Sequence, residues 1–255
     1  MEQLIFQRKA PVFWKECLES TSTELKIMVD KGIEDGTVLV ADRQSGGRGR
    51  QGRSFISPVG GLYMSMLIRP SCLVESCSQI TPLAAVAAQR AVKELTGLEA
   101  DIKWPNDLLL GGKKFCGILT ELSFDSHGKP QIILGVGINL NTPREEFQGE
   151  LEDIACSVYS YCGKIFDKNQ LLELLLKELD EYIFRWEHEG CFFLEEYRQL
   201  NICRKRDVFV IKDGKQRLAR AIEIEDDFSL LVSYENQKQE KLYWGEISVR
   251  DAMKR

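Results

Sequence analysis

The chain has 255 residues, with 34 basic and 39 acidic side chains and a formal net charge of −5. Hydrophobic residues make up 44% and charged residues 29%, which excludes disordered and fibrous proteins and fits one large or two modest domains. Apolar runs such as 132–136 are far shorter than the roughly 18 residues of a membrane span, and residues 1–15 lack a signal-peptide pattern. We therefore expect a cytoplasmic protein that makes no contact with membranes.

The N-terminal part of the chain predicts helices alternating with strands. Residues 21–24 match a capping box, which predicts a helix over about 22–31 that ends at Gly32. β-rich runs at 37–41 and 62–68 predict two strands, with a glycine- and arginine-rich loop between them. A second helix is expected to begin at Thr81-Pro82 and to end at Gly97.

The rest of the chain predicts a sheet, two helices and a second, smaller unit. Short runs separated by turn residues predict a mostly antiparallel sheet, with strands at 101–104, 107–110, 115–122 and 131–140. Leucines at helical spacing predict helices over about 169–187 and 192–200. A small barrel is then predicted from strands at 207–211, 218–224, 230–234 and 241–244. We place a domain boundary near 204, which gives domains 1–203 and 204–255.

The cysteines and histidines exclude several kinds of site. The eight cysteines are scattered without a CxxC pair, so we expect most of them to be reduced and buried. The two histidines, His127 and His188, have no second ligand at metal-binding spacing, so a zinc site is not expected and both should be solvated. Histidine-based catalytic triads are equally disfavoured.

The predicted loop between the first two strands carries an unusual charge. From Arg43 to Val74 there are five arginines and no acidic residue, although the whole chain is acidic. Glycines within RQSGGRGRQGR let backbone amides approach a ligand, and guanidinium groups suit phosphate or carboxylate. The alternative is a solvated, flexible basic loop. The G-x-G-x-x-G match at 47–52 is not a dinucleotide site, because a proline, two glycines and a strand follow it instead of a helix.

Two further segments carry candidate ligand contacts. In the hairpin at 102–122, strict strand alternation puts Lys113 on the face of Gly117 and Lys114 on the opposite face, so only one lysine should contact a ligand. Asp107 suits magnesium, although Asn106-Asp107 after a proline is also ordinary turn chemistry. The two glycines in the strand GVGIN indicate close approach of a ligand or backbone, or a packing requirement alone.

Taken together, these motifs resemble those of the biotin protein ligase family. The resemblance spans nearly the whole chain and rests on EST (19–21), GGRGRQGR (46–53), LYMSM (62–66), KWPND (103–107), KKFCGIL (113–119), GVGIN (135–139) and WGEISVR (244–250). It implies an α+β fold in which helices flank a mixed β-sheet of the class II synthetase type, followed by a small SH3-like barrel. It also implies an ATP-dependent ligase that forms biotinyl-5′-AMP and pyrophosphate, and then passes biotin to a lysine.

The resemblance assigns residues to this chemistry by motif position. Arg48, Arg50 and Lys114 would be catalytic, because they would stabilise charge on the biotin carboxylate and the α-phosphate. The implied biotin site consists of Ser20, Thr21, Ser22, Gln44, Arg48, Gly49, Arg50, Tyr63, Lys114, Gly117 and Gly135. The implied ATP site consists of Arg50, Arg53, Phe55, Lys103, Asn106, Asn139 and Arg250, with Mg²⁺ at Asp107. ATP and Mg²⁺ would act as co-substrate and activator, and no tightly bound cofactor is expected.

The sequence departs from the family pattern at two of these positions. Many members have asparagine where this chain has Ser22, so one hydrogen bond to the biotin ureido ring should be lost or mediated by water. A tryptophan commonly follows the basic loop where this chain has Phe55, so stacking near the adenine should be weaker. Neither change affects the charged groups.

The resemblance also implies partners. The acceptor would be a biotin carboxyl carrier domain, of acetyl-CoA carboxylase or a similar carboxylase, and the ligase would form a homodimer. Only about 19 residues precede Ser20, too few for the DNA-binding module of larger members, so we expect a ligase without repressor function. The net negative charge also argues against DNA binding.

Two other functions remain open from the residues alone. A lipoate or octanoate ligase or transferase has a related fold, but the transferase needs a cysteine nucleophile, and Cys116 has no evident basic partner. An RNA-binding protein would use the Arg/Gly loop, yet only Phe55 and Tyr63 are available nearby for base stacking.

We predict that residues 43–56 are mobile without ligand, because four glycines and several like charges pack poorly in the absence of an anion. Trypsin should cleave after the loop arginines more slowly once biotin and MgATP are added, as followed by mass spectrometry of the fragments. Equal cleavage rates with and without these ligands would contradict the prediction.

Overall fold

The computed structural model describes residues 2–4, 9–71, 73–212, 214–243 and 248–251. In this part of the chain, eight strands form one mixed sheet in the order β1-β2-β3-β4-β8-β7-β6-β5. Only β2 and β3 pair in parallel, so the sheet is mostly antiparallel, as predicted. The strands are β1 (Glu2–Leu4), β2 (Val12–Leu18), β3 (Val38–Gln44), β4 (Leu62–Ile68), β5 (Asp101–Lys103), β6 (Asp107–Leu110), β7 (Lys113–Phe124) and β8 (Pro130–Ile138).

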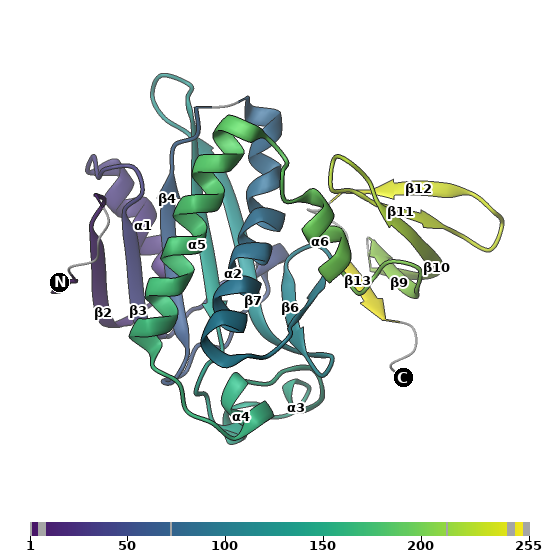
Figure 1. The fold of residues 1–255 in the computed structure, drawn as a ribbon, viewed down its shortest axis with the longest axis horizontal. Coiled ribbons are helices and arrows are strands. Elements are labelled where there is room, and N and C mark those ends of the chain that lie inside the picture. The colour runs from purple at the N-terminus through teal and green to yellow at the C-terminus, as the bar shows by residue number, and fades with distance from the viewer. Residues whose placement is uncertain (1, 5–8, 72, 213, 244–247, 252–255) are drawn as a thin grey trace.

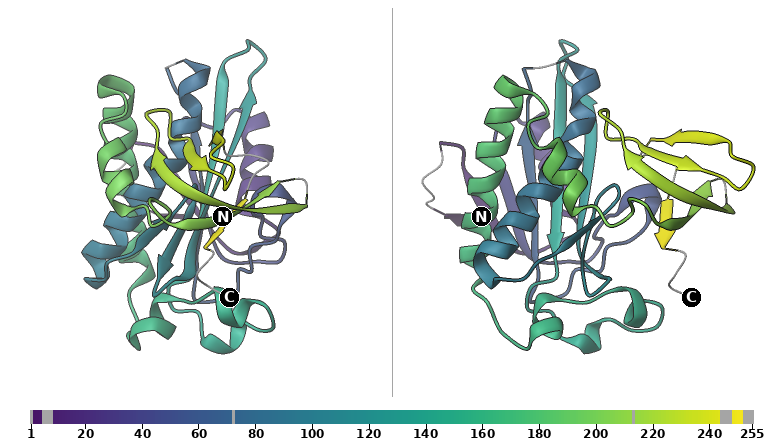
Figure 2. Two further views of the ribbon diagram at one scale, coloured as in Figure 1. Left: turned by 90° about the vertical axis from the view of Figure 1, so that its right-hand side faces the viewer. Right: turned by 45° about the vertical axis from the view of Figure 1, so that its right-hand side comes forward.

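Helices cover both faces of this sheet (Figures 1 and 2). The helices α2 (Ile80–Thr96) and α5 (Lys168–Glu189) pack against each other on one face, and α6 (Leu194–Leu200) contacts α2 beside them. On the opposite face, α1 (Thr21–Asp30) contacts β3, β4 and β8. The predicted fold class, an α+β fold with helices flanking a mixed sheet, is therefore confirmed.

The core lies between the sheet and the α2–α5 layer. Strand β4 is buried at all its positions, because β3 and β8 pair with its two edges and helices cover both faces. Alanines in α2 allow close approach to the sheet, and this helix ends at Gly97, whose φ of 73° allows the predicted left-handed stop. This rigid framework fixes the strand ends from which the site described below is built.

The predicted capping box at the start of α1 is wrong. The residue before the helix is Ser20, and no side chain caps the first turn. The hydroxyl of Thr21 lies instead within hydrogen-bond distance of Ser65 and Gln44, so tertiary contacts have replaced the local cap. The helix itself, predicted over about 22–31, is present.

The second sheet begins at Asp207. In the described residues it has five antiparallel strands in the order β12-β11-β10-β9-β13, which agrees with the SH3-like expectation. Figure 1 shows it to one side of the main body, next to α6. Its strands are β9 (Asp207–Lys212), β10 (Lys215–Ile224), β11 (Leu230–Ser233), β12 (Gln239–Leu242) and β13 (Ser248–Asp251).

Some elements were not predicted. Strand β2 mixes Lys15, Glu16 and Cys17 with apolar residues and is only partly buried, so its sequence shows no clear alternation. The short helices α3 (Leu151–Ile154) and α4 (Val158–Cys162) follow β8, and α4 begins with a capping box at Ser157. No helix in the described part of the chain has both the length and the apolar character needed to cross a bilayer.

Candidate active site

A pocket opens where α1, the arginine-rich loop and strands β4, β7 and β8 meet. Every residue of the predicted biotin site lines it, although these residues come from segments far apart in the sequence. The full lining is Ser20, Thr21, Ser22, Gln44, Arg48, Gly49, Arg50, Phe55, Tyr63, Met64, Asn106, Lys114, Gly117, Ile118, Leu119, Gly135, Val136 and Gly137.

One end of the pocket is a cluster of hydroxyl groups. The Oγ atom of Ser65 lies 2.8 Å from the Thr21 Oγ1 and 3.0 Å from the Ser22 Oγ. The backbone N–H of Thr21 donates to the Gln44 Oε1 at 2.8 Å, and the Gln44 amide nitrogen donates to Ser57. These buried hydroxyls offer both donors and acceptors, which suits a cyclic amide or urea.

The arginine-rich loop folds back over the pocket. Its two ends are joined where the N–H of Gln44 donates to the Ser57 carbonyl and that of Phe55 donates to the Gly47 carbonyl. A Cβ atom on Gly47 would lie 2.2 Å from the Phe55 oxygen, so only glycine fits there. The glycines therefore serve the close fold of the loop, and that fold presents its arginines to the pocket.

The Arg50 guanidinium is held in place without being neutralised. Its Nη1 donates to the Asn106 Oδ1 at 2.9 Å, whereas its Nη2 is buried and has no hydrogen-bond partner among the described residues. Burial lowers the pKa of Arg50, and the nearby Asp107 carboxylate opposes this shift. A buried N–H group without an acceptor is costly, so an anion in the pocket would restore a missing bond.

Lys114 lies in the pocket beside Asp107. Its Nζ is 2.5 Å from the Asp107 Oδ1 and 5.6 Å from the centre of the Phe55 ring. This contact is an ion pair between an ammonium group and a carboxylate. The two groups thus present one positive and one negative charge at the same edge of the pocket.

The predicted placement of the hairpin lysines is wrong. The register between β6 and β7 shifts, so that Leu108 lies opposite Cys116 and Leu109 opposite Lys114. This irregularity leaves Phe115 as an extra residue and breaks the strict alternation. Lys114 therefore lies on the face of Gly117, where an added Cβ would be 3.0 Å from its Nζ, while Lys113 donates to the Glu152 carbonyl.

Arg48 is held by an acidic residue that the sequence analysis did not single out. Glu121 on β7 forms two ion pairs through its Oε1, with the Arg48 Nη2 at 3.2 Å and with the Lys26 Nζ at 2.8 Å. Its Oε2 is buried without a hydrogen-bond partner in the described residues. Glu121 thus steers the Arg48 side chain across the mouth of the pocket.

The glycines of the floor make room for neighbouring side chains. A Cβ on Gly137 would lie 2.7 Å from the Phe55 ring, and one on Gly135 would lie 3.0 Å from the Ser22 Oγ. The Phe55 ring also packs edge-on against Tyr63, with centroids 6.3 Å apart. The glycines of GVGIN therefore make room for neighbouring side chains, and both also line the pocket.

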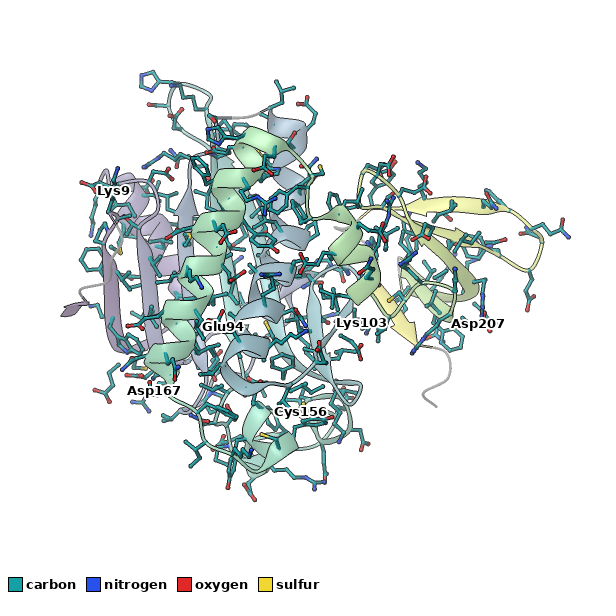
Figure 3. The ribbon with its side chains drawn as sticks, viewed as in Figure 1. Lys9, Glu94, Lys103, Cys156, Asp167 and Asp207 are labelled. Carbon is teal, nitrogen blue, oxygen red and sulfur yellow. The ribbon has the colours of Figure 1, made fainter. Side chains whose placement is uncertain are left out.

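The predicted ATP site is only partly assembled at the pocket. Arg50, Phe55 and Asn106 line it and Asp107 lies beside it, but Arg53, Lys103 and Asn139 do not line it. Lys103, labelled in Figure 3, lies on the side of the main body next to the second sheet. The backbone of Arg250 lies in β13 opposite Phe209, and its side chain is outside the described residues.

Sequence reasoning missed several residues of the site besides Glu121. Ser65 is a polar residue within the otherwise apolar core of β4, and that contrast was a signal for it. Ser57 accepts the Gln44 amide, and nothing in its sequence context marks it. The apolar walls are Met64, Ile118, Leu119 and Val136.

The structure gives no support for Cys116 as a nucleophile. Cys116 is fully buried within β7, and burial raises the pKa of its thiol above the usual range. His127 and His188 are both exposed on the surface, as predicted. A buried thiol in its neutral form is a poor nucleophile.

Comparison with known proteins places the chain in a family. The sequence pattern of the biotin/lipoate A/B protein ligase family matches residues 14–139. The chain is 37% identical, over 65% of its length and 51% of the relative's, to the bifunctional ligase/repressor BirA of Bacillus subtilis. It is 30% identical, over 70% of its length and 66% of the relative's, to the biotin–[acetyl-CoA-carboxylase] ligase of Mycobacterium tuberculosis.

The fold comparison agrees with the sequence comparison. The biotin protein ligase of Aquifex aeolicus, solved in complex with biotin and ATP, superposes with a TM-score of 0.81 at 28% identity and covers 96% of this chain and 100% of its own. The chain belongs to the biotin protein ligase branch of the biotin/lipoate ligase family. It spans about half the length of the Bacillus relative.

We predict that Cys116→Ala retains at least half of the wild-type ligase activity, because its thiol has no chemical role. The substitution should cost about 1 kcal/mol of stability through the small cavity it leaves. Initial rates and a urea denaturation curve of the purified variant measure both quantities. A loss of activity in a folded variant would favour the transferase hypothesis.

Proposed function

We propose that the protein is a biotin protein ligase. It activates biotin with ATP to give biotinyl-5′-AMP and pyrophosphate, and then transfers biotin to a lysine of a biotin carboxyl carrier domain. The observation that carries the proposal is the convergence of a hydroxyl cluster and of Arg48, Arg50 and Lys114 in one pocket. The hydroxyls suit the biotin ring, and the cations suit its carboxylate and the phosphate.

In the first step, a biotin carboxylate oxygen attacks the α-phosphorus of ATP. The bond from this phosphorus to the oxygen bridging to the β-phosphate breaks, and pyrophosphate leaves. Two anions must approach each other, so fixed positive charge is needed at the reacting atoms. Arg50, with its unpaired Nη2, and Lys114 supply it, since both side chains line the pocket.

In the second step, the lysine amine of the acceptor attacks the carbonyl carbon of the mixed anhydride. The amide bond forms, AMP leaves, and the amine loses a proton. The arginine-rich loop shields the anhydride from water until the acceptor arrives. Arg48, anchored by Glu121 at the pocket mouth, is placed to contribute to this shielding.

Magnesium fits the residues present at the nucleotide side. The Asp107 carboxylate lies at the edge of the pocket, where its Oδ1 is ion-paired with the Lys114 Nζ, and the described residues contain no cluster of three or more ligating side chains. A single carboxylate with water and phosphate oxygens is the usual coordination of Mg²⁺ at nucleotide sites. Bound there, the ion would neutralise charge on the phosphates.

Further features complete the proposal. The acceptor is a carrier domain of acetyl-CoA carboxylase or a similar carboxylase, and the enzyme acts as a cytoplasmic homodimer that does not bind DNA. The catalytic domain is 1–203 and the SH3-like domain 204–255. A lipoate or octanoate substrate is disfavoured, because a plain acyl chain would make no use of the hydrogen-bond capacity that the hydroxyl cluster still has.

The first experiment is biotin-dependent exchange of labelled pyrophosphate into ATP, with lipoate and octanoate as competing acids. We expect exchange with biotin and Mg²⁺, because adenylate formation is reversible. Exchange with lipoate instead would assign the protein to the sister ligases, and no exchange with any acid would contradict adenylate chemistry.

We predict that Arg50→Ala lowers the rate of adenylate formation about a hundredfold, as for loss of one charge-stabilising donor. The variant should also release adenylate into solution, so that lysines of a bystander protein become biotinylated. A streptavidin blot of the bystander measures this release.

Arg43→Ala is the matched control. Arg43 lies in the same basic segment but is exposed and does not line the pocket, so its variant should keep wild-type rate and selectivity. Tight retention of adenylate by Arg50→Ala would count against the role assigned to Arg50.

A further inference from the structure

The second sheet reaches the main body through the turn between β10 and β11. Phe228 in this turn is fully buried and has a left-handed backbone conformation, with φ of 62°. Its ring stacks on Phe193 at 5.2 Å and meets the Tyr197 ring edge-on at 5.6 Å. A phenylalanine held in this conformation is fixed by its surroundings, so the turn forms a rigid contact.

Two hydrogen bonds connect this contact to the segment that precedes Asn106. The Trp104 indole Nε1 donates to the Phe228 carbonyl at 3.0 Å. The Tyr197 hydroxyl donates to the Pro105 carbonyl, also at 3.0 Å. All of these side chains are buried, so both bonds are protected from water and define the path of residues 104–105.

From this segment the connection continues to Arg50. The Asn106 Nδ2 donates to the Ile118 carbonyl at 2.8 Å, and the Ile118 N–H donates back to the Asn106 carbonyl at 3.0 Å. Because these bonds fix the carboxamide, its Oδ1 can hold the Arg50 Nη1 in one place only. A shift of the Pro105 carbonyl would therefore move Asn106 and, with it, the guanidinium.

We infer that Tyr197 and Phe228 are positioning residues for the nucleotide side of the pocket, acting through the Trp104–Pro105 segment on Asn106 and Arg50. The inference rests on the proposed function. Neither residue lines the pocket. A phenylalanine at position 197 would satisfy packing alone. The tyrosine hydroxyl is instead buried, and it donates a hydrogen bond to the Pro105 carbonyl, next to Asn106.

The effect should divide between the two substrates. The hydroxyl cluster for biotin is built on α1 and β4 from Thr21, Ser22 and Ser65, and its hydrogen bonds do not involve residues 104–106. Arg50 also belongs to the implied biotin site, but the hydroxyl contacts of biotin do not depend on residues 104–106. Loosening this segment should therefore weaken ATP binding more than biotin binding.

The test compares Tyr197→Phe with Tyr182→Phe in the full-length enzyme. Tyr182 is also buried, and its hydroxyl donates to Glu196 at 2.8 Å without contact to the 104–106 segment, so the control loses the same group. We expect the KM for ATP in pyrophosphate exchange to rise about three- to tenfold in Tyr197→Phe and less than about twofold in the control. The Kd for biotin, from titration calorimetry without ATP, should rise by a smaller factor than the KM for ATP in Tyr197→Phe and change less than about twofold in the control.

A second pair of variants covers the case in which Tyr197→Phe does not fold. Trp104→Phe removes the hydrogen bond to Phe228. Trp186→Phe is its control, since the Trp186 indole on α5 donates to Gln79, the residue just before α2. The same selective rise in the KM for ATP is expected for Trp104→Phe alone.

Unchanged KM values for ATP in the folded variants, or equal weakening of biotin and ATP, would overturn the inference. These outcomes differ from failure of the proposed function. Absence of biotin-dependent exchange in the wild-type enzyme would contradict that function, whereas an active wild type with normal variants contradicts only the positioning role.

Discussion

The pocket depends on a guanidinium group that is half-buried and only partly paired. Removing a charge from water is costly, and a neighbouring carboxylate in full hydrogen-bond contact would have repaid that cost while cancelling the charge. The neutral Asn106 Oδ1 accepts a hydrogen bond from Arg50 and offsets part of this desolvation cost, so Arg50 keeps its orientation and its charge. An anionic ligand that accepts from the buried Nη2 would therefore gain a hydrogen bond that the protein itself does not make.

The other features of the site keep this arrangement compact. Strand glycines normally weaken a sheet, and Gly117 and Gly137 are tolerated because Phe55 packs directly on them. The ring closes the space that missing side chains would have filled, and it anchors the end of the loop that carries Arg48 and Arg50. The cost of the glycines is thus offset by contacts that hold the cationic loop against the sheet.

The sequence predicted the elements with strong local signals and missed those set by tertiary contacts. The apolar run of β4 and the Thr81-Pro82 start and Gly97 stop of α2 identified these elements to within a residue or two. The biotin-site residues came from motif resemblance and meet in one pocket. The prediction of a capping box at α1 was wrong because the Thr21 hydroxyl bonds to Ser65 on β4, a tertiary contact that no local sequence pattern contains.

The predicted strand faces of Lys113 and Lys114 were wrong for a related reason. Alternation assumes an unbroken ladder, whereas the irregularity at Phe115 depends on how β6 and β7 pair. The ATP residues were less well placed, since Lys103 and Asn139 belong to the motifs yet lie outside the pocket lining. A motif fixes the order of residues along the chain, and the distance of each from the ligand depends on packing.

The sheet order has a consequence for synthesis of the protein on the ribosome. Strand β4 lies between β3 and β8, so after pairing with β3 it keeps one edge of unpaired backbone N–H and C=O groups until Pro130–Ile138 has been made. During that interval the nascent chain exposes a strand that favours pairing with other chains. Since β4 also carries Tyr63 and Ser65, the pocket is completed only when the edge is covered, and binding competence coincides with the end of this vulnerable stage.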